Sequence, residues 1–329
     1  MQLFINTYGT YVHIKDEMFE IRTKVEKTDE IKHFASHKVK SIILQKGMSI
    51  STDAIILALK NNIDVIIADY DGFPIGRIWH GKSGSTSKIR KRQLEASLNE
   101  TGLNWVKDWI SAKLLNQADY LKDLKKNRKA KEEFIEEKIS KLEEFLKQTD
   151  KLKGAKTEDI ADTLRGYEGN AGRIYFETLS SLLSEEYSFT GRSSRPAKDP
   201  FNAFLNYSYG ILYSRVEKAL IIAGLDPYLG FMHRDDYNQK SLVFDFIEPY
   251  RTHAERLVFK LFSAKRINKS HTDEIKNGFT LNDEGKKLLV PEFMKYLEED
   301  KILYKNKHQS RANILQSDAH QFANSLIKD

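Results

Sequence analysis

Three short segments carry acidic or imidazole side chains in apolar or glycine-rich surroundings. Glu168 lies in RGYEGNAGRIYF, His233 follows the apolar run LGFM, and Asp245 and Glu248 lie in SLVFDFIEPYR. Glycines inside an apolar helix cost about 1 kcal/mol each relative to alanine, so they favour a place where another backbone or a ligand approaches closely. Carboxylates among apolar residues are costly to bury unless a cation or a proton compensates their charge. These segments are therefore the candidates for a reactive site.

The residue types favour a hard divalent cation. One histidine with two or three carboxylates and no cysteine suits Mg²⁺ or Mn²⁺ better than a structural zinc site. If residues 241–251 are helical, Asp245 and Glu248 project from one face, because they are three residues apart. Each segment alone also has a structural explanation, as a surface carboxylate at Glu168 or a core histidine at His233.

The composition limits the classes of protein that could carry such a site. The 329 residues include no cysteine, which excludes disulfide scaffolds, thiolate zinc sites, Cys nucleophiles and iron–sulfur clusters. The longest clean apolar run, Ala54–Leu59, is too short to span a membrane, and the first residues lack the pattern of a secretory signal. We therefore expect a soluble, cytoplasmic protein with no membrane partner.

The positive charge lies outside the first 80 residues. The chain has 53 Lys and Arg against 47 Asp and Glu, and residues 1–80 hold ten of each. Lys82–Arg92 contains five basic residues and no acid, and Lys113–Lys131 contains seven basic residues against two acids. Such clusters favour a nucleic-acid partner, although solvated helix faces can also be basic.

The elements that position these residues fall into two parts. Residues 1–80 predict a small, sandwich-like β domain, because short runs of β-branched and aromatic residues alternate with turn formers. The Gly/Ser/Lys stretch at 81–88 is typical of a linker. We expect strands at 3–6, 10–15, 18–23, 39–44, 64–69 and 73–80, the first three as a meander, and a helix at 53–61 capped by Ser51 or Thr52.

From residue 89 to 329 the apolar period becomes helical. One stripe runs from Trp105 to Leu124, and a second recurs through Ile135, Ile139, Leu142 and Leu146. Further helical windows lie at 201–223, 241–263 and 290–299. The predicted fold class is α+β, with a small N-terminal β-rich domain followed by a larger all-α domain that holds every candidate catalytic residue.

Taken together, the three segments resemble a known family. Glu168 in RGYEGNAGRIYF, His233 in GLDPYLGFMH and Glu248 in FDFIEPYR resemble, in order and spacing, the metal triad of the CRISPR-associated integrase-endonuclease family (Cas one, the spacer-acquisition enzymes). QKGMSIST with DGFPIGRI is similar to its N-terminal β domain, and KIRKRQ to the basic segment leading into its helical domain. KLLNQADYL is similar to its first long helix, and RSSRPAKDPFNAFLNYSYGILY to a segment near its site.

The resemblance implies a metal-dependent DNA endonuclease and integrase of CRISPR adaptation. Such an enzyme inserts foreign DNA fragments, the spacers, into the CRISPR array by 3′-hydroxyl transesterification. It implies that Glu168, His233 and Glu248 are catalytic ligands of Mg²⁺ or Mn²⁺, with Asp245 as an auxiliary carboxylate.

The resemblance also implies partners. These are double-stranded DNA (the foreign fragment and the CRISPR repeat), a second copy of the chain, and the small protein Cas two. A homodimer through the β domain agrees with the apolar β-type surface that Ile42, Ile43, Val65, Ile66 and Ile67 offer.

Side chains expected to contact DNA are basic residues near the triad or in the segment before the helical domain, with two polar residues at family positions. They are Arg90, Arg92, Arg165, Arg173, Arg192, Arg195, Asn202, Tyr209 and Arg251.

Two other functions remain open from the sequence. One is a non-enzymatic DNA-binding scaffold whose carboxylates are structural, which would show no site-specific Mn²⁺ binding. The other is a metal-dependent DNA repair nuclease outside CRISPR adaptation, which the position of the gene relative to a repeat array would distinguish.

Overall fold

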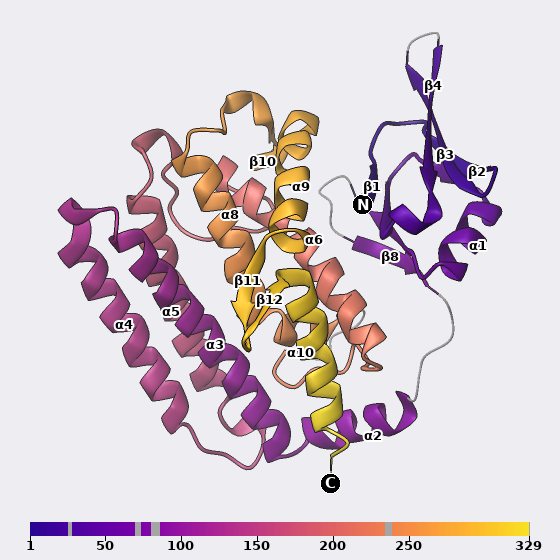
Figure 1. The fold of residues 1–329 in the computed structure, drawn as a ribbon. Coiled ribbons are helices and arrows are strands. Elements are labelled where there is room, and N and C mark those ends of the chain that lie inside the picture. Colours follow the sequence, from indigo (N-terminus) through magenta and orange to yellow (C-terminus); the bar gives the residue numbers. More distant parts are fainter. Residues whose placement is uncertain (26–27, 70–73, 80–85, 234–238, 329) are drawn as a thin grey trace. The chain divides into compact units, whose positions relative to one another are not determined.

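The computed structural model describes residues 1–25, 28–69, 74–79, 86–233 and 239–328. The chain divides into two compact units, Met1–Ser83 and Gly84–Asp329 (Figure 1). Of the predicted linker at 81–88, residues 81–85 lie outside the described residues. Residues 86–88 belong to helix α2 (Thr86–Ser97), so this part of the stretch is helical.

The described residues of the N-terminal unit form two four-stranded sheets and one α-helix, α1 (Thr52–Lys60) (Figure 1). The Ser51 side chain accepts a hydrogen bond from the Ala54 N–H and caps α1, as predicted. Apolar residues of both sheets and of α1, among them Val12, Ile42 and Ala58, share one core. In order across the sheets, the strands are β1 (Gln2–Ile5), β5 (Ser41–Gln45), β7 (Asp64–Ala68) and β8 (Pro74–Ile78), and β4 (Thr28–Ala35), β3 (Met18–Val25), β2 (Tyr11–Lys15) and β6 (Ser49–Ile50).

The prediction that the first three strands form a meander is wrong, because the meander begins at the second strand. β1 pairs in parallel with β5, and the antiparallel run is β2, β3 and β4. The sequence analysis missed β4 because its residues, TDEIKHFA, are mostly polar and exposed, so they give no apolar alternation. A strand with so few buried side chains leaves little trace in the side-chain pattern.

The C-terminal unit is mostly helical, with two small hairpins. The hairpins, β9 (Thr272–Ile275) with β10 (Gly278–Leu281) and β11 (Lys301–Tyr304) with β12 (Lys307–Ser310), were not predicted. Each strand has four residues, too short for a periodicity signal, and the second hairpin turns through the positive φ angles of Lys305 and Asn306. The α+β fold class with a small N-terminal β-rich part is confirmed.

Helices α3, α4 and α6 fall in predicted windows, α9 begins before the window 290–299, and α2 and α10 were not predicted. The window 241–263 is interrupted, because a 3₁₀ turn separates α7 from α8. The α-helices are α2, α3 (Glu100–Lys125), α4 (Glu132–Lys151), α5 (Ala161–Ser181), α6 (Pro200–Ile222), α7 (Ser241–Phe246), α8 (Arg251–Ser263), α9 (Asp283–Glu298) and α10 (Arg311–Ser325). The 3₁₀ turns of this unit are η2 (Lys129–Lys131), η3 (Thr157–Asp159), η4 (Glu185–Tyr187), η5 (Glu248–Tyr250) and η6 (Lys269–His271), whereas η1 (Ser36–Lys38) lies in the N-terminal unit.

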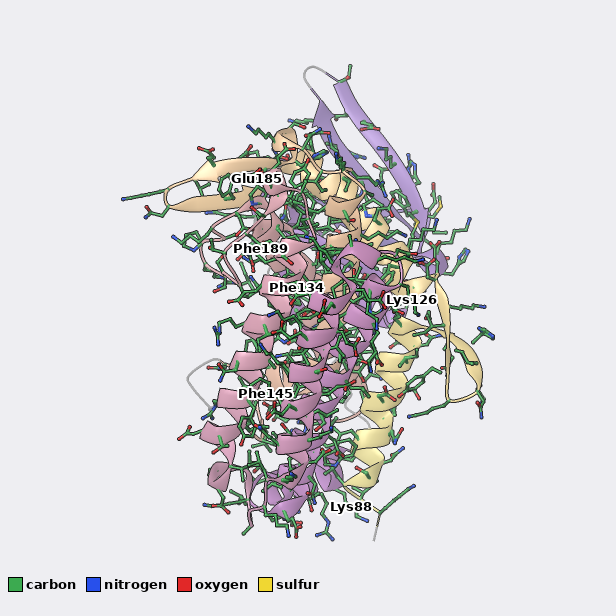
Figure 2. The ribbon with its side chains drawn as sticks, turned by 90° about the vertical axis from the view of Figure 1, so that its left-hand side faces the viewer. Lys88, Lys126, Phe134, Phe145, Glu185 and Phe189 are labelled. Carbon is green, nitrogen blue, oxygen red and sulfur yellow. The ribbon has the colours of Figure 1, made fainter. Side chains whose placement is uncertain are left out.

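Helix α3 is the central element of this unit. It packs against α4, α5, α8 and η5, and buries the predicted stripe that includes Trp109 and Tyr120. Ile135, Ile139 and Leu142 of α4 are also buried, so α4 packs on the bundle along its predicted face (Figures 1 and 2). In Figure 2, Phe134 and Phe145 mark the course of α4. Among the described residues, no helix is both long and apolar enough to cross a membrane.

One buried glutamine ties α2 to the segment that leads to His233. The Gln93 side-chain amide donates to the carbonyls of Asp226 (2.9 Å) and Leu229 (2.8 Å), and its oxygen accepts from the Asp226 N–H (2.9 Å). Gln93 is fully buried, so these backbone groups have no access to water through its position. Helix α2 thereby fixes where the loop after α6 runs.

We predict that Gln93→Met destabilises the C-terminal unit. The substitution keeps the volume but leaves buried backbone groups without partners, so the free energy of unfolding should fall by about 2 kcal/mol or more. Urea denaturation followed by tryptophan fluorescence measures this unit preferentially, since Trp105 and Trp109 lie in it and only Trp79 lies outside. The control is Gln148→Met, which removes only a bond to Glu144; equal effects of the two variants would contradict the prediction.

Candidate active site

A buried ammonium group brings together two of the three predicted metal ligands. The Nζ atom of Lys113, on α3, lies 2.5 Å from Glu168 Oε1 on α5 and 2.6 Å from Glu248 Oε2 in η5. The side chains of Lys113 and Glu248 are 9% and 1% exposed, whereas that of Glu168 is 22% exposed. Because α3 packs against both α5 and η5, the helix packing itself makes the two carboxylates converge.

The glycines around Glu168 leave an open face on α5. A Cβ atom added at Gly166, Gly169 or Gly172 would meet no heavy atom of the described residues within 4 Å. The glycines are therefore not required by a neighbouring protein backbone. Gly169 and Gly172, one and four residues after Glu168, add no side chain beside it, so a ligand can come close to the helix backbone there.

Glu248 is held as a buried anion by two cations. Arg251 Nε donates to Glu248 Oε1 at 2.8 Å, and the guanidinium group lies 5.2 Å from the ring centroid of Tyr209. Burial alone would raise the pKa of Glu248, but Arg251 and Lys113 outweigh it and lower the pKa to about 2. Oε2 makes no well-aligned hydrogen bond within the described residues, only the ion pair with Lys113.

Asp245 orients His233. Asp245 Oδ1 lies 2.5 Å from His233 Nδ1, and its two oxygens accept the backbone N–H groups of Phe231 (2.6 Å), Met232 (3.0 Å) and His233 (3.1 Å). Burial by itself would lower the pKa of His233, but the hydrogen bond to Asp245 and the charges of Asp245, Glu248 and Glu168 raise it. The negative charges of both carboxylates of the Lys113 cluster therefore stabilise the protonated imidazole. Nδ1 bonds to Asp245, so Nε2 is the ring nitrogen available to bind a ligand.

The loop before His233 is packed too tightly to accept a side chain at Gly230. A Cβ atom there would lie 2.5 Å from the Cβ of Ser241 and 2.9 Å from Asp245 Oδ2. Arg165 holds the same loop from α5, since its Nη2 donates to the Met232 carbonyl at 2.9 Å. The position of His233 thus depends on contacts from several helices.

The prediction that Asp245 and Glu248 share one helix face is wrong. Helix α7 ends at Phe246, and Glu248 begins the 3₁₀ turn η5, which includes Pro249. Asp245 accordingly bonds to the His233 loop, whereas Glu248 bonds to Lys113 and Arg251. The change of helix type gives the two carboxylates separate roles, one orienting the imidazole and one in the charged cluster.

The residues suit a hard divalent cation, but they do not enclose one. Within the described ranges, no three His, Asp or Glu side chains lie close enough together to hold a metal ion. The chemistry of the donors nevertheless fits, because two carboxylates and an imidazole oriented through its other nitrogen are typical ligands. Where Glu168 and Glu248 converge, the positive charge is the Lys113 ammonium, so a metal ion would share or displace it. The triad of Glu168, His233 and Glu248 stays a prediction.

Asn202 and Tyr209, expected to contact DNA, make internal contacts instead. Asn202 is fully buried, donates to the Gly191 carbonyl at 2.9 Å and to Asp199 Oδ2 at 2.7 Å, and accepts from Arg192 Nη1 at 2.8 Å. Tyr209 is 5% exposed, and its hydroxyl donates to Glu255 Oε1 at 2.7 Å. Their contacts shape the start of α6 and the wall beside Arg251.

The remaining basic candidates lie at or near the surface. Arg90 is exposed on α2, Arg92 pairs with Glu95 at 2.7 Å, and Arg195 is exposed before α6. Arg173 is 65% exposed and lies one turn beyond Gly169 on α5. Nothing in their contacts tests DNA binding, so these assignments stay predictions.

The sequence analysis missed two positions that build the site, Lys113 and Gln93. Lys113 lies in the apolar stripe of α3, four residues after Trp109 and four before Gln117. A lysine in a buried stripe requires an acidic partner, so its position was a usable signal. Gln93 gave no such signal, because a glutamine that follows a basic segment cannot be told from an exposed polar residue by its sequence context.

Comparisons with known proteins agree with the geometry. The family model described as CRISPR associated protein Cas1 matches residues 3–295. The chain is 31% identical to the CRISPR-associated endonuclease Cas1 1 of Archaeoglobus fulgidus over 96% of this chain and 93% of the relative. It is 34% identical to the CRISPR-associated protein Cas1 3 of Methanobrevibacter ruminantium over 86% and 84%.

Solved structures share the fold at lower identity. A casposase bound to an integration product aligns with a TM-score of 0.83 at 22% identity, covering 99% of this chain and 90% of that chain. A Cas1 protein from Thermotoga maritima aligns with a TM-score of 0.82 at 22% identity, covering 100% and 98%. Since the family model spans most of the chain and the relatives match it nearly end to end, the chain belongs to the CRISPR-associated protein Cas1 family.

Proposed function

We propose that this chain is a metal-dependent DNA endonuclease and integrase of CRISPR adaptation. The main support for this proposal is that Glu168 and Glu248 converge on one buried cation, Lys113, next to a histidine that Asp245 orients. Membership of the Cas1 family and the likeness of the fold to a casposase bound to an integration product support the same reaction class.

The reaction we propose is a phosphodiester transfer. The 3′-hydroxyl of a foreign DNA fragment attacks a phosphorus atom of the repeat, a new P–O bond forms, and the strand beyond the broken P–O bond leaves as a 3′-hydroxyl. A divalent cation bound by Glu168, His233 and Glu248 would stabilise the phosphorane charge and lower the pKa of the attacking hydroxyl.

The residues of the chain supply positioning and charge. Glu248 stays ionised because Arg251 and Lys113 neutralise it, so its carboxylate is available as a ligand without a proton to lose. The Arg251 guanidinium uses Nε for Glu248, and its terminal NH₂ groups suit a phosphate oxygen. Asp245 holds the imidazole so that Nε2, not Nδ1, is offered to a ligand.

The proposal includes DNA, a second copy of the chain and a Cas2-type partner. A chain of the structure described as Cas6-RT-Cas1–Cas2 complex shares the fold with a TM-score of 0.79 at 21% identity, and the match covers 99% of this chain and 35% of that chain. The apolar residues that suggested a dimer contribute little free surface, since Ile42 and Val65 lie in the core and Ile43 and Ile66 in a smaller cluster. Ile67 is 40% exposed. The homodimer therefore rests on the family.

We predict that Glu168→Gln and Glu248→Gln each abolish integration of a labelled DNA duplex into a repeat-bearing plasmid while DNA binding changes less than threefold. Affinity comes from many phosphate contacts, whereas the carboxylates act on the metal. Glutamine keeps the volume and an oxygen that can accept from Arg251 Nε. This matters at Glu248 because a shorter side chain would leave the buried Arg251 without its partner, whereas Lys113 keeps Glu168.

Direct Mn²⁺ binding by calorimetry is the second measurement for these variants. Glu177→Gln, an exposed position on α5, is the matched control and should behave as the unmodified chain. Full activity of Glu168→Gln would overturn the triad. Absence of Mn²⁺ binding in the unmodified chain would instead favour the scaffold function.

We predict that Lys113→Met makes the chain depend on a divalent cation for stability. Without the ammonium group, two carboxylates face each other with less compensation, so the melting temperature in EDTA should fall by several degrees. Added Mn²⁺ should then raise the melting temperature more than it does in the unmodified chain, because the cation replaces a missing charge.

Lys122→Met is the control for this measurement, since Lys122 forms only surface ion pairs on the same helix. An equal Mn²⁺ effect in the unmodified chain, Lys113→Met and Lys122→Met would show that Lys113 and the metal do not share the carboxylates.

We predict that replacing Arg90, Lys91 and Arg92 together by alanine weakens DNA binding and flattens its salt dependence. Each lost phosphate contact should reduce the slope of log K against log salt by about 0.9 for duplex DNA. The triple alanine variant of Lys138, Lys141 and Lys147 on α4 is the charge-matched control. If both variants have the slope of the unmodified chain, the basic part of α2 is only a solvated helix face.

A further inference from the structure

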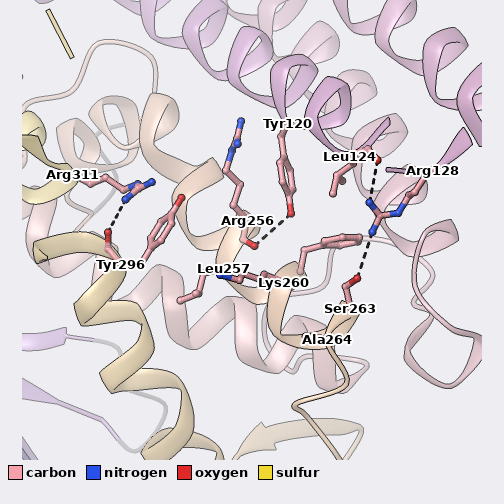
Figure 3. A pocket seen from close by; sticks show the side chains of 11 residues that line it. Tyr120, Leu124, Arg128, Arg256, Leu257, Lys260, Ser263, Ala264, Tyr296 and Arg311 are labelled. Carbon is pink, nitrogen blue, oxygen red and sulfur yellow. Dashed lines mark hydrogen bonds between the residues drawn. The ribbon is translucent and has the colours of Figure 1, made fainter. Parts of the chain in front are cut away.

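A polar cavity lies in the C-terminal unit, away from the carboxylate cluster. It has a volume of about 480 Å³ and lies between α3, α8, α9 and the start of α10 (Figure 3). Its polar walls are Arg128, Arg256, Lys260 and Arg311, with Tyr120 and Tyr296. Four cationic side chains from three segments, two of them on α8, thus face one concave space large enough for part of a ligand.

Two of the arginines are fixed over tyrosine rings. The Arg256 guanidinium lies 4.5 Å from the ring centroid of Tyr120 and pairs with Asp123 at 3.0 Å. The Arg311 guanidinium lies 3.7 Å from the ring centroid of Tyr296 and donates to its carbonyl at 2.9 Å. These contacts orient both guanidinium groups and leave further N–H donors for an acceptor, since each guanidinium carries five.

The other two cations have no acidic partner among the described residues, and the Arg128 guanidinium lies 5.6 Å from the ring centroid of Phe259. Arg128 donates to the Leu124 carbonyl at 3.1 Å and to Ser263 Oγ at 3.4 Å, both neutral acceptors (Figure 3). Lys260 is exposed and makes no hydrogen bond or ion pair with the described residues. Within the same part of the chain, Asp123 is the only carboxylate in an ion pair with a lining cation. The cavity therefore has a net positive wall.

The positive charges of the cavity wall also affect the pKa of a neighbouring histidine. His253, on α8 beside Tyr296, has its pKa lowered to about 3, first by burial and then by the charges of Arg311 and Arg256. A neutral imidazole between these arginines adds no further positive charge, and it cannot compensate them either. The positive potential is thus left for a ligand from outside.

We propose that this cavity binds a phosphodiester group of a DNA strand. The ligand is an anion rather than a base, because guanidinium groups already cover one face of each tyrosine ring and their donors form the polar wall. The assignment of the anion to DNA rests on the proposed function.

The position on α3 gives the spacing between the two sites. Lys113 and Tyr120 are seven residues apart, so they lie on the same side of the helix and about 10 Å apart along its axis. A DNA strand advances about 3.4 Å per nucleotide along a duplex. A phosphate in the cavity would therefore lie within a few nucleotides of the one at the carboxylate cluster.

The test uses two variants of the full chain. Lys260→Gln removes the cation that has no partner to lose, so the fold should be unaffected. Asp123→Asn combined with Arg256→Gln removes both members of an ion pair, so the net charge of the chain is unchanged and no buried charge is orphaned. Lys147→Gln, an exposed lysine on α4, is the charge-matched control for Lys260→Gln.

Binding is measured by anisotropy with a labelled DNA duplex and with its labelled single strand over a range of salt concentrations. EDTA is present, so the result does not depend on whether the chain transfers strands. We expect each variant to bind DNA three- to tenfold more weakly than the Lys147→Gln control. The salt slope should fall by about 0.9 for the duplex or about 0.7 for the single strand per lost contact.

Inorganic phosphate and pyrophosphate are the second arm, measured by thermal shift. If they stabilise the unmodified chain but not the variants, while DNA affinity and salt slope stay unchanged, the cavity is a site for a small free anion and the DNA assignment is overturned. If neither DNA binding nor thermal stability with phosphate distinguishes the variants from the control, the cavity binds no phosphate. Loss of strand transfer in Glu168→Gln with intact effects at the cavity would separate the two sites.

Discussion

The buried ion cluster of Lys113, Glu168, Glu248 and Arg251 is the constraint on which the helical unit depends. Charges in a poorly solvated interior are tolerated only when opposite charges meet them at short distance. Lys113 on α3 therefore fixes α5 through Glu168 and η5 through Glu248, and Arg251 fixes the start of α8. Few other arrangements of these helices would satisfy all four groups, so the same contacts that hold the helices together also assemble the candidate site.

The imidazole is placed by a separate set of contacts. Its loop is held by the Gln93 amide from α2, by Asp245 from α7 and by Arg165 from α5. None of these contacts lies in the ion cluster, although the charges of Glu168 and Glu248 reach His233. A site built from two independently anchored parts can hold its carboxylates and its imidazole in position before a metal ion or DNA arrives.

The carboxylate cluster and the cationic cavity of the helical unit differ in how their charges are paired. In the carboxylate cluster, cations and anions are paired and buried, which suits ligands that act on a bound cation. In the cavity lined by Arg256 and Arg311, these two guanidinium groups lie over tyrosine rings, and among the described residues Arg256 is the one lining cation paired with a carboxylate. Helix α3 contributes to both, with Lys113 in the first and Tyr120 in the second, so one rigid element sets the distance between them.

The sequence by itself determined the fold class, the family, the candidate ligands and most helices, because these depend on local periodicity and on motifs whose residues are close together in the chain. It did not determine that β1 pairs with β5, that 272–281 and 301–310 form hairpins, or that Asp245 and Glu248 face different partners. Asn202 was expected at DNA and is buried, while Lys113 and Gln93 were overlooked. Strand order, the ion cluster and the cationic cavity are long-range: each joins side chains or backbones from segments far apart in the chain. Only tertiary packing brings such groups together, and it leaves no period in the sequence from which they can be read.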